Sequence, residues 1–275
     1  MTRRVVAGVS PFDARPELLA WAAAEAGARH AALELVSACP PRAGAEVVDA
    51  VRTSLAEAGR SVSGVEVRTR TVIGPAEHVL RAAADGADLL VVGADDHSPF
   101  VEAITGSVPG GLLTTSPCPL VVVPKDAAPV GPAAPVLVGV DTAEASRAAL
   151  NYAFAAAARS GRDLHVVLCW TAPRERAERV LERAREHRAL AISLAGYGER
   201  YPGVAVAELV VDDDPVTELT RRARRAALLV LGSRGRGRLA SMAFGSVSRT
   251  LIRSSRCPVA VIRPDLVPAG QLDPA

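Results

Sequence analysis

The sequence predicts an α/β protein with two consecutive domains, each built on a doubly wound parallel sheet of five strands. The chain has 275 residues, which is enough for two domains of ordinary size. Short apolar runs typical of buried strands alternate with helix patterns, and this order indicates a parallel sheet. The second half also repeats the first, since residues 89–93 match 228–232 and residues 116–124 match 255–264. A repeat this long indicates two domains rather than a solenoid.

The two copies are joined by a stretch rich in proline, alanine and glycine, so we expect domains over 1–125 and 135–275. Right-handed crossovers should place helices on both faces of each sheet. In the first copy we expect strands near 4–9, 32–38, 65–72, 88–93 and 119–123, and helices near 14–28, 44–58, 75–85 and 106–115. In the second copy we expect strands near 135–140, 163–169, 203–211, 227–232 and 258–262, and helices near 143–159, 174–195, 215–225 and 246–254.

Charge and composition narrow the functional classes. The formal net charge is only +2, which argues against a dedicated nucleic-acid binder or a membrane-surface protein. The chain starts almost directly with a strand pattern, so we expect no signal peptide. The longest charge-free run, 103–124, is broken by glycine and proline and makes a poor membrane span. The four cysteines lack CxxC spacing, so we expect reduced thiols and a cytoplasmic protein.

The strongest motif for a ligand lies in the second copy. Residues 228–231 indicate a buried strand, and Gly232 and Gly235 allow the chain to turn sharply and to approach a ligand closely. Gly245 and Ser246 follow, and Ser246 is a good N-cap for the next helix. Strand, glycine-rich loop and helix N-terminus form an anion site, because free N–H groups and the positive end of the helix dipole face the loop. The phosphate contacts would come from Gly232, Arg234, Gly235, Gly245, Ser246 and Val247.

Two other phosphate motifs are excluded or disfavoured. A P-loop needs a lysine after its second glycine, and the only lysine in the chain, Lys125, lies at the linker. Residues 235–240 formally fit the dinucleotide pattern G-x-G-x-x-A. They follow the fourth predicted strand of their copy, however, and no acidic residue stands about twenty positions later. We therefore do not expect a dinucleotide in this loop.

The spacing of glycine, two residues, glycine, nine residues and Gly-Ser resembles the motif of the ATP-binding branch of the universal stress protein family. The resemblance covers both copies and implies a Rossmann-like fold, similar to the adenine nucleotide α-hydrolases, with strand order 3-2-1-4-5. It also implies ATP as the ligand, with Mg²⁺ held through the nucleotide phosphates. By the same resemblance, Asp141 hydrogen-bonds the adenine and ribose side of ATP, and the backbone near Cys169 contacts adenine. Thr142 and Ala143 depart from the Gly-Ser usual after the aspartate, and Asp141 also suits an N-cap.

The first copy keeps only part of this motif. Its loop retains Gly93 and a Gly-Ser pair, but Ser10 replaces the aspartate and Asp96 replaces the second glycine. The loop 93–107 carries three acidic residues and no basic one, whereas 232–246 carries three arginines and no acidic residue. Because a polyphosphate is repelled by carboxylates, we expect one nucleotide per chain, bound by the second copy.

The remaining polar residues form no catalytic constellation. The five histidines lack metal-ligand spacing, and no Ser/His/Asp or paired-carboxylate arrangement stands out. We expect solvent-exposed helix faces at the arginines of 221–225 and at the mixed charges of 174–188. The sequence thus favours an ATP-binding stress-response protein that acts as a nucleotide-dependent switch, not a committed ATPase, although slow hydrolysis is compatible with it.

Two alternatives come from other classes. One is a nucleotide-independent interaction module with a vestigial loop. The other is an adenylate-forming ligase, which would need a further substrate domain beyond the two copies. The family resemblance also implies pairing through the fifth strand of each copy, 120–123 and 259–262, either within the chain or in a homodimer. Edge strands this apolar need cover.

Overall fold

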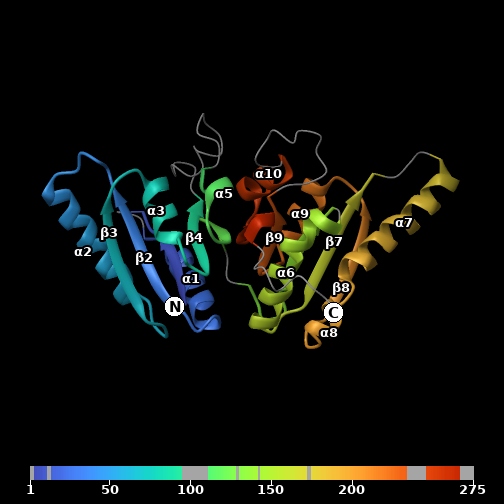
Figure 1. Ribbon diagram of the computed structural model, residues 1–275, viewed down its shortest axis with the longest axis horizontal. Helices are drawn as coiled ribbons and strands as arrows, with labels where there is room; N and C mark the ends of the chain where they lie inside the picture. Colours follow the sequence, from blue (N-terminus) through green and yellow to red (C-terminus); the bar gives the residue numbers. More distant parts are fainter. Residues whose placement is uncertain are drawn as a thin grey trace. The chain divides into compact units, whose positions relative to one another are not determined.

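The computed structural model describes residues 3–10, 14–94, 111–127, 130–141, 143–171, 175–233 and 246–266. The chain divides into two compact units, Met1–Ala128 and Pro129–Ala275. Each unit contains one parallel sheet with helices on both faces (Figure 1). The predicted fold class, two tandem doubly wound domains of five strands each, is confirmed.

Unit 1 has the strand order β3-β2-β1-β4-β5, and every pair is parallel. The order places the first strand in the centre and reverses the winding between β1 and β4. Its elements are β1 (Arg4–Gly8), α1 (Pro16–Ala28), β2 (Ala32–Cys39), α2 (Ala45–Ser61), β3 (Val67–Ile73), α3 (Ala76–Ala84), β4 (Leu89–Ala94), α5 (Gly111–Thr115) and β5 (Leu120–Pro124).

Unit 2 repeats this topology with the order β10-β9-β6-β7-β8, again entirely parallel. Its strands are β6 (Val136–Val140), β7 (Leu164–Trp170), β8 (Val206–Asp212), β9 (Leu228–Gly232) and β10 (Val259–Ile262). Its helices are α6 (Ala143–Ser160), α7 (Arg176–Leu194), α8 (Tyr197–Arg200), α9 (Pro215–Ala223), α10 (Ser246–Ser254) and the short 3₁₀ turn η1 (Pro264–Leu266).

The central strands form the hydrophobic core of each unit. In unit 2, Val138 pairs with Val166 on one side and with Val230 on the other, and all three are fully buried. Right-handed crossovers put α6 and α7 on one face of the sheet and α9 and α10 on the other, and these helix pairs are in contact. Strands covered on both faces explain the nearly continuous apolar runs in the sequence.

One helix of unit 2, α8, was not expected from the sequence. It follows Gly196, whose φ of 80° lies in the left-handed region that glycine adopts without strain. Tyr197 and Tyr201 both stack on the buried ring of Phe154, with ring centroids 4.4 and 5.5 Å apart. The Tyr197 hydroxyl donates to Asn151 Oδ1 at 2.8 Å. The longer middle of the second copy therefore packs a small aromatic cluster against α6.

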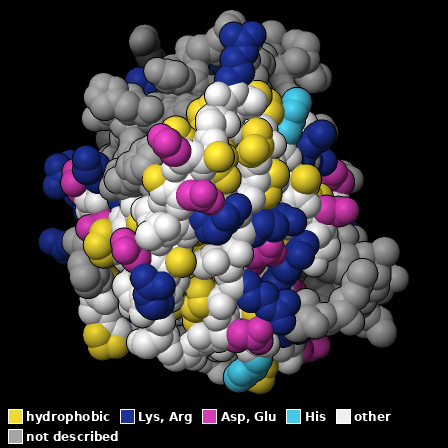
Figure 2. Space-filling model, turned by 90° about the vertical axis from the view of Figure 1, so that its left-hand side faces the viewer, with side chains coloured by type: hydrophobic (Ala, Val, Ile, Leu, Met, Phe, Trp, Pro, Cys, Tyr) yellow, Lys and Arg dark blue, Asp and Glu magenta, His cyan; other side chains and the backbone are white. Residues whose placement is uncertain are grey.

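Charged side chains protect the exposed edge strand of unit 1. On β3, Arg68 pairs with Glu66 at 2.8 Å, and Arg70 pairs with Glu34 of β2 at 3.1 Å. Basic and acidic side chains are interspersed over this side of the unit (Figure 2). Charge on an edge strand discourages pairing with another chain, which suits an edge that faces solvent.

Two further expectations concern the described residues. All four cysteines are free thiols, three of them buried and Cys169 half-buried, as the lack of CxxC spacing predicted. Within the part of the chain that the structure describes, no helix combines the length and the apolar character needed to cross a membrane.

The same close contact joins a helix to the central strand of each unit. A Cβ added to Gly8 would lie 2.9 Å from Leu80 Cδ1, and a Cβ added to Gly139 would lie 2.8 Å from Leu219 Cδ1. Both leucines are buried, Leu80 on α3 and Leu219 on α9, in the helix that precedes the fourth strand of each unit. Because glycine has no side chain, each helix can pack closely against the central strand of its sheet.

We predict that Gly139→Ala lowers the free energy of unfolding by about 1–3 kcal/mol, because the new methyl group displaces Leu219 from a packed position. Gly203→Ala is the matched control, since its Cβ would meet nothing within 4 Å. Urea denaturation of both variants measures the difference. Equal stability of the two variants would show that the leucine relocates without cost.

Candidate functional site

The carboxyl ends of β6 and β9 form the switch point of unit 2. The two strands pair in parallel up to Gly139 and Leu231, so their next residues leave the sheet at the same edge. Asp141 follows β6, and Gly232 ends β9. In open parallel sheets, ligands bind in the crevice beyond this point, where the strand order reverses. The structure therefore brings together two of the residues that the sequence singled out.

Asp141 is held by a hydrogen-bonded loop to its own helix. Its backbone N–H donates to Ser146 Oγ at 3.0 Å, and that hydroxyl donates to Asp141 Oδ1 at 3.2 Å. Ser146 is 4% exposed, on the first turn of α6, and Asp141 is half-buried. The buried hydroxyl fixes the direction in which the carboxylate leaves the strand, while Asp141 keeps access to solvent. Sequence reasoning found no role for Ser146.

On the other side of the crevice, α10 is tied to the end of β9. Ser248 Oγ donates to the carbonyl of Gly232 at 3.0 Å, and Ser248 is 7% exposed. The N–H of Ser233 donates to the carbonyl of Ile262 at 2.9 Å, which extends the β9–β10 pairing by one step. These contacts hold the first turn of α10 beside the strand end. A helix N-terminus placed in this way suits an anion.

The predicted anion motif is only partly described. Ser246 and Val247 begin α10, as predicted, and Gly232 ends β9. Arg234, Gly235 and Gly245 lie outside the described residues, and their roles stay predictions.

Cys169 lies on the neighbouring strand β7, one residue beyond the pair formed by Val140 and Leu168. It therefore stands next to Asp141 at the same edge of the sheet. Burial raises the pKa of its thiol to about 11, and the nearby carboxylates of Glu218 and Asp213 act in the same direction. A thiol that stays protonated at neutral pH offers no negative charge to repel a nucleotide.

A buried carboxylate, Glu218, was missed in the sequence. Glu218 belongs to α9, and its side chain is only 3% exposed. It forms salt bridges with two arginines of the next turn, Arg221 (Nε–Oε2, 2.7 Å) and Arg222 (Nε–Oε1, 2.5 Å). Hydrogen bonds from Arg221 and Arg222 hold the pKa of Glu218 below its usual value, against the opposing effect of burial. At the matching position, 139 residues earlier, unit 1 has Val79.

Unit 1 builds its switch point differently. Arg15 occupies the position matching Ser146, and its side chain is only 7% exposed. It reaches across to the end of β4, where Nη1 donates to the carbonyl of Ala94 at 3.0 Å. A Cβ on Gly93 would lie 1.4 Å from Arg15 Nη2, so the guanidinium rests directly on this glycine. Gly93 is conserved between the copies in sequence, yet in unit 1 it accommodates an arginine of the protein itself.

Two tandem doubly wound parallel sheets, each with its strand order reversed between the first and the fourth strand, define an α/β protein of the Rossmann-like class. The model of the Universal stress protein family matches residues 1–124 and 133–263. The chain therefore belongs to the universal stress protein family.

Relatives of similar length share the tandem arrangement. Universal stress protein Rv2623 of Mycobacterium tuberculosis is 32% identical over 296 residues, covering 95% of this chain and 97% of that protein. The crystal structure of a universal stress protein from Archaeoglobus fulgidus aligns with a TM-score of 0.66 at 18% identity, covering 94% of this chain and 96% of that one. A universal stress protein solved in complex with cAMP aligns with 44% of this chain and 96% of its own, at 26% identity and a TM-score of 0.38.

We predict that Glu218→Gln destabilises unit 2 in a pH-dependent way. A lowered pKa means that the carboxylate stabilises the fold above the pKa of the unfolded state, near 4.5, and that this contribution is lost as the pH falls through the folded-state value. At pH 7, the variant should unfold with a free energy lower by roughly 2 kcal/mol, because two guanidinium groups lose their buried partner.

The difference between wild type and variant should shrink when urea denaturation is repeated below about pH 4. Glu178→Gln on α7 is the control, because Glu178 is exposed and should change stability little at any pH. A pH-independent gap between wild type and Glu218→Gln would contradict the ion-pair explanation.

Proposed function

We propose that this universal stress protein binds ATP in unit 2 and acts in the cytoplasmic stress response as a nucleotide-dependent switch. One observation carries the proposal: Asp141 and the N-terminal turn of α10 lie at the adjacent ends of β6 and β9. A carboxylate fixed by Ser146 can accept hydrogen bonds from the ribose hydroxyls and the adenine amino group. The N–H groups of α10 can bind the phosphates.

The loop between β9 and α10 completes the proposed site. Its arginines at 234, 236 and 238 give it a formal charge of +3, which complements a triphosphate. Mg²⁺ would be held through the phosphates rather than by a protein cluster, since it prefers phosphate and water oxygens. Association of two chains through an apolar edge strand, as the family resemblance implies, stays a prediction alongside the cytoplasmic location.

We predict that Asp141→Ala weakens ATP binding by about tenfold to a hundredfold, because it removes a charge-assisted hydrogen bond worth about 1.5–3 kcal/mol. Ser146→Ala should have a smaller effect in the same direction, since the carboxylate stays but loses the hydroxyl that orients it. Titration calorimetry with ATP and Mg²⁺ measures both.

Asp163→Ala provides the control, because this exposed aspartate precedes β7 at the opposite edge of the sheet. If Asp141→Ala melts at a lower temperature but binds ATP like the wild type, the aspartate only supports the start of α6.

Unit 1 should not take a second nucleotide. Arg15 covers Gly93 at the switch point, and the exposed Ser10 stands in place of the aspartate. The acidic loop 93–107 adds like charge where phosphates would lie. Although a guanidinium can attract phosphate, this one already donates to Ala94 and rests on the glycine that the ligand would approach.

We therefore predict a stoichiometry of about one ATP per intact chain in calorimetry. Ser10→Ala should leave both stoichiometry and affinity unchanged, whereas Asp141→Ala at the matching position should affect the only site. Two equivalents per chain, or a response to Ser10→Ala, would assign a second nucleotide to unit 1.

A further inference from the structure

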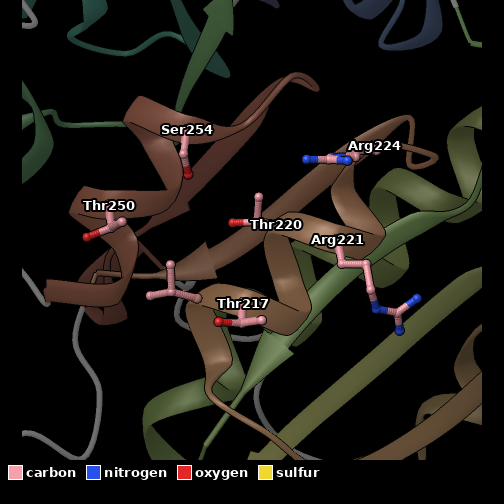
Figure 3. Close-up of a pocket in the computed structure, with 7 residues that line it drawn as sticks. Thr217, Thr220, Arg221, Arg224, Thr250 and Ser254 are labelled. Atoms are coloured by element: carbon pink, nitrogen blue, oxygen red, sulfur yellow. The ribbon is translucent and has the colours of Figure 1, made fainter.

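A hollow of about 480 Å³ lies between α9 and α10, and none of the residues that line it belongs to the proposed nucleotide site. Its polar lining comes from Thr217, Thr220, Arg221 and Arg224 on or next to α9, and from Thr250 and Ser254 of α10. We call this the α9–α10 groove. In Figure 3, Arg224 extends from the end of α9 toward α10, and the hydroxyls of Thr220 and Ser254 point into the space between the helices. The side chain of Arg221 points away, consistent with its pairing to Glu218.

The two segments that contribute the groove are strongly basic in sequence, and the matching segments of unit 1 are not. Residues 215–225 and 246–256 contain seven arginines and a single acidic residue, a formal charge of +6. The matching residues of unit 1, 76–86 and 107–117, carry a formal charge of −1. Glu218, the only acidic residue of these two segments, is buried against Arg221 and Arg222. Among the described residues, Arg224 has no ion-pair partner, so its charge is available to an outside group.

Unit 1 shows what such a groove accommodates. Glu77 of α3, which matches Val216, directs its carboxylate onto α5, where a Cβ on Gly111 would lie 1.6 Å from Oε1. Gly111 in turn matches Thr250. In unit 1, a carboxylate of the protein therefore lies between the third helix and the helix before the fifth strand. In unit 2 the residue that matches Glu77 is Val216, which carries no carboxylate. Arg224 of unit 2 stands where unit 1 has the acidic residue Asp85.

We propose that the α9–α10 groove binds a carboxylate-rich segment of a partner protein. One carboxylate enters the groove and accepts hydrogen bonds from the Arg224 guanidinium and from the hydroxyls of Thr220 and Ser254. Guanidinium and carboxylate match in geometry and charge, which favours such a pair at an interface. Flanking acidic side chains then face the remaining arginines of the two helices, which promotes association and sets its salt dependence.

Fluorescence anisotropy of a fluorescein-labelled peptide of ten glutamates, added to the intact protein without nucleotide, tests the proposal. We expect saturable binding that weakens with added salt. Arg224→Asp should reduce the affinity by about tenfold or more, since it replaces the central donor by a like charge. Arg183→Asp on α7 changes the net charge equally at an exposed site and should retain most of the affinity.

Val216→Glu provides a second variant that keeps every arginine. It gives unit 2 the internal carboxylate of unit 1 and should compete with the peptide, lowering its affinity by several fold. Melting curves verify that each variant is folded. Asp141→Ala should bind the peptide like the wild type, so failure of the nucleotide proposal leaves this test intact.

Three outcomes would overturn the proposal. The first is that the peptide does not bind, and the second is that Arg224→Asp and Arg183→Asp weaken peptide binding equally. The third is that a labelled DNA duplex of equal length binds more tightly than the peptide and with the same dependence on Arg224. The last result would assign the groove to nucleic acid instead.

Discussion

Parallel pairing of the first and fourth strands is the constraint on which each unit depends. In unit 2, the register of β6 with β9 sets the ends of two distant segments on one edge of the sheet. The close approach of Leu219 to Gly139 packs α9 against β6. Once this pairing is set, Asp141, Gly232 and the start of α10 lie at the same edge of the sheet, and the Ser248–Gly232 hydrogen bond holds α10 there. The site follows from the topology, and its side chains decide what it can bind.

The two units show how far one scaffold can diverge at matched positions. A serine that orients a carboxylate in unit 2 is replaced in unit 1 by an arginine that covers a glycine. A glutamate paired with two arginines is replaced by a valine. None of these exchanges alters the strand order or the register of the central pair. The two units therefore share the same backbone arrangement, while the polar side chains at the carboxyl edges of their sheets differ.

Much of this architecture could be predicted from the sequence. Apolar runs and glycine or proline breaks located the ten strands of the described residues, and the Gly-Ser pair located the start of α10, because these features depend on local chemistry. The short helix α8 could not be found in this way. Four residues carry no helical period, and they are held by the stacking of Tyr197 on Phe154, more than forty positions earlier.

Side-chain positions at the site were harder to predict than elements. Arg15 precedes a helix and has the sequence context of a solvated charge, and its burial depends on Gly93 at the end of another strand. Glu218 likewise belongs to an arginine-rich helix that reads as a surface face. In contrast, the family resemblance singled out Asp141, and the structure places it directly after the first strand of unit 2, while its role in binding stays a prediction. The loop residues Arg234, Gly235 and Gly245 stay predictions.

The ionisation of the cysteine thiols determines how readily peroxides react with them. Burial raises the pKa of Cys118, Cys169 and Cys257 to about 11, so these thiols stay protonated at neutral pH. Peroxides attack the thiolate and not the thiol. These three sulfurs are therefore poor targets for peroxide at neutral pH.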